Sequence, residues 1–60
     1  MRNLDRIPTI CDRLAKLWAK VPDWRLGQLL VNLINQDPFY MEDEEFLDYL
    51  ESRLNEIIGE

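Results

Sequence analysis

Apolar residues recur at three- and four-residue steps over the first third of the chain. They are Ile7, Ile10, Cys11, Leu14, Leu17 and Trp18. This spacing places them on one stripe of an α-helix. Pro8 falls in the first turn, where its missing N–H costs little, and Asp5 is suited to cap the start. The pattern predicts a helix over about residues 5–20 that ends before Pro22, with Cys11 as a small buried filler on the stripe.

The apolar pattern widens in the second predicted helix, over about residues 24–35. Val21-Pro22-Asp23 has the composition of a tight connection, and Asp23 is a good N-cap for this helix. At about 100° per residue its apolar side chains cover an arc of about 200°, roughly twice the stripe of a surface helix. They are Leu26, Leu29, Leu30, Val31, Leu33 and Ile34. Such a helix must be covered on more than one side, and Gly27 either lets another helix approach closely or is merely tolerated.

Aromatic residues stand beside both connections between the predicted helices. Asp37-Pro38 favours a turn, after which Phe39 and Tyr40 have two interpretations. They either fold back to close the core, as burial tendencies favour, or form an exposed contact for a partner. At the first connection, Trp24 either packs with Trp18 as a corner of the core or serves as an interface anchor.

A third helix is predicted over about residues 42–58. Four consecutive carboxylates open it, at the positive end of the helix dipole, and Gly59 is a fitting C-terminal stop. Its apolar stripe consists of Phe46, Leu47, Leu50, Leu54, Ile57 and Ile58. The whole chain, residues 1–60, is therefore expected to be a single all-α domain: a compact three-helix unit that forms a homo-oligomer, with a dimer favoured.

Chain length and composition support self-association and argue against catalysis. A 60-residue domain buries only about 60% of the surface that its unfolded chain exposes, and oligomerisation is one way to strengthen so small a core. The chain has one cysteine and no histidine. This excludes an intramolecular disulfide and removes the commonest metal ligand and the commonest general base. We therefore expect no catalytic residues, no metal and no cofactor.

Charge is segregated along the chain. Residues 1–25 carry a net charge of +3, residues 26–41 of −1 and residues 42–60 of −7. The basic edge and the acidic face are either solvated surfaces that attract each other or binding sites. The acidic face would bind a basic protein surface, or imitate a phosphate backbone, through Glu44, Glu45, Asp48 and Glu51. The basic edge would bind a small phosphorylated ligand through Arg6, Arg13, Lys16, Lys20 and Arg25.

The overall charge argues against nucleic acid and membrane surfaces as partners. For a chain with a net charge of −5 and a pI near 4.5 we expect no general attraction to nucleic acid or to an anionic membrane surface, unless a localised basic stripe overrules it. No apolar run exceeds three residues, and charged residues stand near the start, where a signal peptide would carry its apolar part. We expect a cytoplasmic protein.

Two short motifs resemble a family of very short bacterial and prophage-borne helical proteins. They are Pro22-Asp23-Trp24-Arg25-Leu26-Gly27-Gln28-Leu29 and Asp37-Pro38-Phe39-Tyr40, the latter followed by Glu42-Asp43-Glu44. The resemblance implies an all-helical fold in a bacterial or phage-infected cell and, by analogy, an inhibitor of a host factor. We expect a non-catalytic interaction module, with a ligand-sequestering oligomer as the alternative. The expected interface residues of the interaction module are Trp24, Gln28, Leu30, Val31, Asn32, Ile34, Phe39 and Tyr40.

Overall fold

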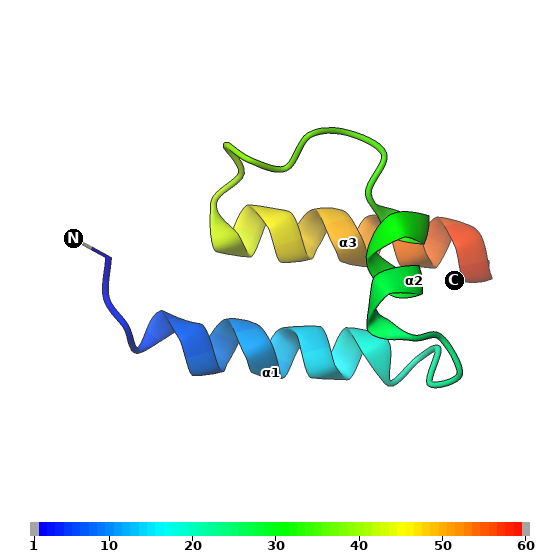
Figure 1. The fold of residues 1–60 in the computed structure, drawn as a ribbon, viewed down its shortest axis with the longest axis horizontal. Coiled ribbons are helices and arrows are strands. Elements are labelled where there is room, and N and C mark those ends of the chain that lie inside the picture. The colour runs from blue at the N-terminus through cyan, green and yellow to red at the C-terminus, as the bar shows by residue number, and fades with distance from the viewer. Residues whose placement is uncertain (1, 60) are drawn as a thin grey trace.

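Three helices make up the part of the chain that the structure describes, residues 2–59. In this computed structural model α1 comprises Arg6–Trp18, α2 comprises Leu26–Leu33 and α3 comprises Asp43–Ile58 (Figure 1). None of residues 2–59 belongs to a β-strand. The all-α class that the apolar periodicity predicts is therefore confirmed.

The first and third helices lie side by side and run in the same direction (Figure 1). Because they are parallel, the chain must return to the start of α3 after leaving the end of α1. It returns in two parts: α2 crosses near the C-terminal ends of α1 and α3, and residues 34–42 then pass back along α3 to its first turn. The molecule measures 37 × 22 × 21 Å.

A core of leucines joins the three helices. All six have at most 2% of their surface exposed: Leu17 of α1, Leu29 and Leu33 of α2, and Leu47, Leu50 and Leu54 of α3. Burying a leucine side chain contributes about 1.5–3 kcal/mol. Trp18 and Trp24 pack against this cluster as half-buried side chains, which confirms that the tryptophans form a corner of the core.

The connection from α1 to α2 is longer than predicted. α1 ends at Trp18 rather than Lys20, and Trp18 Nε1–H donates to the Trp24 carbonyl oxygen at 2.7 Å, which fixes the turn between them. Asp23 does not cap α2. The helix begins after Arg25, whose backbone N–H donates to the Gln28 side chain at 2.8 Å. At the start of α1, Asp5 holds the predicted cap position but its side chain makes no capping hydrogen bond.

The end of α2 is fixed by α3. α2 stops at Leu33, two residues before the predicted end, and the backbone turns extended at Ile34. The Tyr49 hydroxyl accepts the backbone N–H of Asn35 at 2.7 Å, and Arg53 Nε–H donates to the Leu33 carbonyl oxygen at 3.0 Å. These two α3 side chains satisfy backbone groups that would otherwise continue the helical hydrogen bonding.

The expectation that Cys11 is buried is wrong, because its side chain is exposed. Ile10, Leu14, Leu17 and Trp18 are the residues by which α1 contacts the core. Cys11 lies about 100° around the helix axis from Ile10. It is on the same side as Ile7, whose side chain is likewise exposed, at 46%. A stripe predicted from periodicity is wider than the surface that one neighbouring helix covers.

Phe39 and Tyr40 do not fold back to close the core, so the interpretation that burial tendencies favour is wrong. They are 78% and 88% exposed. The backbone N–H of Met41 donates to the Pro38 carbonyl oxygen at 3.0 Å, so the four residues from Pro38 to Met41 form a turn with Phe39 and Tyr40 at its tip. Pro38 and Met41 are the half-buried members of this turn.

The contact between Tyr49 and the end of α2 predicts a measurable stability effect. Tyr49→Phe should lower the free energy of unfolding by about 1 kcal/mol, because the ring stays in place while the hydroxyl's hydrogen bonds are lost. The matched control is Tyr40→Phe, at a position that is 88% exposed. Urea unfolding of the three proteins at one protein concentration would measure the difference, and equal midpoints for Tyr49→Phe and the unsubstituted chain would contradict it.

Candidate functional site

The basic edge of α1 faces the acidic side of α3. Arg13 Nη2 lies 3.0 Å from both Asp48 Oδ1 and Glu51 Oε1, and Arg6 Nε lies 2.7 Å from Asp43 Oδ2. These hydrogen bonds raise the pKa of Arg13, the one to Glu51 most. Mutual attraction of the two charged faces therefore accounts for Arg6 and Arg13.

The remaining predicted anion-binding residues do not gather into one site. Lys16 pairs within α1, with its Nζ 2.9 Å from Asp12 Oδ2. Lys20 and Arg25 are exposed and make no ion pair with residues 2–59. A phosphorylated ligand on this edge would have to compete with the carboxylates that already hold Arg6 and Arg13.

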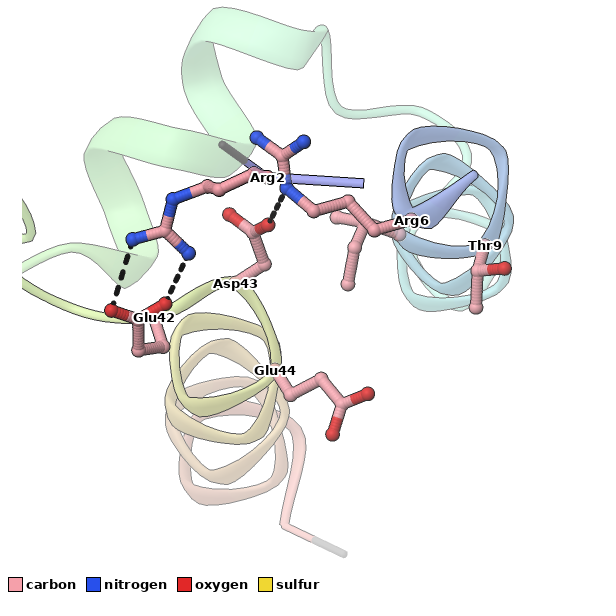
Figure 2. Close-up of a pocket in the computed structure, with 7 residues that line it drawn as sticks. Arg2, Arg6, Thr9, Glu42, Asp43 and Glu44 are labelled. Atoms are coloured by element: carbon pink, nitrogen blue, oxygen red, sulfur yellow. Dashed lines mark hydrogen bonds and ion pairs between the residues drawn. The ribbon is translucent and has the colours of Figure 1, made fainter. Parts of the chain in front are cut away.

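A groove of about 440 Å³ separates the N-terminal halves of α1 and α3 (Figure 2). Arg2 bridges it through two hydrogen bonds to the Glu42 carboxylate, the longer at 3.1 Å. The Arg6–Asp43 pair crosses it beside them. The hydrogen bond from Arg2, and then its charge, lowers the pKa of Glu42. The groove thus has two guanidinium groups and two carboxylates that bind one another, which leaves them poorly placed for acid–base chemistry.

Among residues 2–59 there is no cluster of three or more histidine, cysteine, aspartate or glutamate side chains that could hold a metal ion. Nor does any helix in this part of the chain have the length and apolarity needed to cross a lipid bilayer.

A second candidate surface is the exposed side of α2. Its members Leu26, Gly27, Leu30 and Val31 lie between the buried leucines and the polar side of the helix, and we call them the α2 outer face. Val31 is 79% and Leu26 40% exposed. A Cβ atom at Gly27 would meet no other part of the chain within 4 Å, so no described helix uses the close approach that glycine permits.

The predicted interface residues fall into two groups. Trp24, Leu30 and Ile34 are half-buried, and Trp24 and Ile34 contact the leucine core. The exposed group consists of Gln28, Val31, Asn32, Phe39 and Tyr40. Phe39 and Tyr40 form an edge-to-face pair with ring centroids 4.9 Å apart.

Of the predicted acidic face, Asp48 and Glu51 pair with Arg13, while Glu44 and Glu45 are exposed and make no ion pair with residues 2–59.

The sequence-based expectations did not include the Arg2–Glu42 bridge or the exposure of Leu26. Opposite charges 40 residues apart give no signal of contact until the helices are known to be parallel.

The chain matches no protein-family model, no curated protein and no solved structure. The resemblance to short prophage-borne proteins stays a prediction, and function has to be inferred from the surfaces themselves.

The Arg2–Glu42 bridge predicts a pH effect with a definite sign. Because the folded-state pKa of Glu42 is lowered, the bridge stabilises the fold above the unfolded pKa, and this stabilisation is lost as pH falls through the folded pKa. NMR titration of the Glu42 carboxyl should give a pKa below its ordinary value near 4.5, and Arg2→Gln should raise it. Lys20→Gln, which removes a distant charge, is the control. An equal pKa in all three proteins would show that the bridge does not form.

Proposed function

We propose that this chain is a non-catalytic protein-interaction module that self-associates through the α2 outer face. The observation that carries this proposal is the exposure of Val31, which stands on a helix opposite fully buried Leu29 and Leu33. An aliphatic side chain 79% exposed on an element that otherwise anchors the core is suited to burial by a partner.

The dimensions of the chain support the need for a partner. Its accessible surface is 4659 Å², whereas a compact monomer of its mass exposes roughly 4,100 Å². Its radius of gyration is 11.8 Å, against about 10.4 Å for a compact domain of this length. The excess surface and the small leucine core both favour association with another chain.

A second copy fits the α2 outer face because the face is uncharged. Each chain carries a net charge of −5, so two copies repel each other wherever their acidic surfaces meet. The stretch from Leu26 to Gln36 has no ionisable side chain. A two-fold contact of α2 with α2 would bring together apolar groups without like charges between them, and Gly27 leaves room for close backbone approach.

The absence of catalysis is part of the same proposal. The chain has no histidine, and the guanidinium and carboxylate groups that bridge the α1–α3 groove are engaged with one another. An enzyme needs a nucleophile, a base or a metal held in a pocket. The other polar side chains that line the groove, Thr9 and Glu44, make no hydrogen bond to each other.

Solution mass tests self-association directly. Light scattering and native mass spectrometry should give twice the 7.2 kDa of one chain for the unsubstituted protein. Val31→Glu should give the mass of one chain, because two carboxylates would face each other in an uncharged contact.

Ile7→Glu is the matched control, since Ile7 is also an exposed aliphatic residue but lies at the start of α1, away from α2. It should leave the dimer intact. A single-chain mass for the unsubstituted protein across a dilution series, or equal masses for Val31→Glu and Ile7→Glu, would contradict the proposal.

A further inference from the structure

The exposed aromatic pair at the turn before α3 is not used by the fold or by the α2 outer face. Phe39 and Tyr40, here called the aromatic tip, contact each other edge to face and leave most of their ring surface to solvent. The tip lies at the end of the segment that passes back along α3, whereas α2 crosses near the other end of that helix (Figure 1). The aromatic tip is therefore a separate surface from the α2 outer face.

The backbone of the aromatic tip is held in place. Phe39 N–H donates to Asp37 Oδ1 at 3.0 Å, and Met41 N–H donates to the Pro38 carbonyl oxygen at the same distance. Pro38 restricts the backbone further, because its ring fixes φ. A tip ordered before binding loses less conformational entropy when a partner docks on it, and rigid aromatic side chains are common anchors in protein interfaces.

The charged residues next in sequence to the aromatic tip are all acidic. Residues 37–45 contain five carboxylates and no cation. Arg2 and Arg6 pair with Glu42 and Asp43, but the other three, Asp37, Glu44 and Glu45, make no ion pair with residues 2–59. Aromatic ring faces attract cations, and the uncompensated carboxylates add long-range attraction for a basic chain.

We infer that the aromatic tip is a docking site for a basic segment of another protein, one that presents arginine or lysine next to aliphatic side chains. The cationic groups would lie over the ring faces and near the carboxylates that make no ion pair, while the aliphatic groups would cover the ring edges. The charge complementarity excludes a second copy of this acidic chain as the preferred occupant.

Fluorescence anisotropy with a labelled peptide of alternating arginine and leucine tests the inference. The peptide should bind the unsubstituted protein, and the double variant Phe39→Ala with Tyr40→Ala should bind at least about tenfold more weakly, as loss of an interface anchor implies. Glu44→Gln with Glu45→Gln should also weaken binding and should reduce its dependence on salt. A peptide with glutamate in place of arginine should not bind.

Matched variants separate this site from self-association. Ile57→Ala changes a half-exposed aliphatic residue at the far end of α3, and Val31→Glu changes the α2 outer face; both should keep the affinity of the unsubstituted protein. The inference is overturned if the peptide fails to bind, if the double aromatic variant binds as tightly as Ile57→Ala, or if that aromatic variant turns a dimer into a monomer. A monomeric unsubstituted protein that still binds the peptide would refute self-association alone.

Discussion

The parallel packing of α1 on α3 is the constraint on which the rest of this structure depends. Two parallel helices cannot be joined by a short turn, so the chain between them must travel back over much of the length of α3, about 24 Å for its 16 residues. Here that segment includes α2 and residues 34–42. This segment contributes Leu29 and Leu33 to the core, and it also contains both the α2 outer face and the aromatic tip.

Surface ion pairs contribute little to stability individually, but here their order along α1 matches the direction of α3. Arg6 meets Asp43 at the starts of the two helices, and Arg13 meets Asp48 and Glu51 further along both. This order along α1 matches the order along α3 only when the helices are parallel. The leucine core has no comparable polarity, because apolar contact is non-directional. These ion pairs therefore form together only with α3 parallel to α1.

The sequence predicts the helices well where their ends depend on local chemistry. The acidic first turn of α3 and the stop at Gly59, which has φ of +81°, agree with the structure because dipole and left-handed backbone effects act within a few residues. The ends of α2 depend on contacts from elsewhere. Tyr49 and Arg53 bind backbone atoms 14 and 20 residues away, and no pattern within α2 reveals them.

Burial is the property that the sequence predicts least well, because it depends on which side of each helix receives a neighbour. Cys11 lies on a periodic apolar stripe and Phe39 is a large apolar residue, yet both are exposed. In both cases the residue type indicates that the side chain favours burial, but the topology decides whether another part of the chain is there to cover it. The candidate surfaces were likewise only partly predictable from the sequence. Residue type indicated Val31 and Tyr40 as interface residues, but their separation into two surfaces follows from the crossing of α2 and from the turn at Pro38.

The separation of charge along the chain gives these two surfaces different chemistry. Arg6 and Arg13 of α1 pair with Asp43, Asp48 and Glu51 of α3. Glu44 and Glu45, which lie in the first turn of α3 close in sequence to the aromatic tip, make no ion pair with residues 2–59. The uncharged stretch from Leu26 to Gln36 lies on α2 and the start of the returning segment. The two proposals therefore assign an identical, equally acidic chain to the uncharged apolar surface and a cationic partner to the aromatic rings. The residues that the two proposals involve do not overlap.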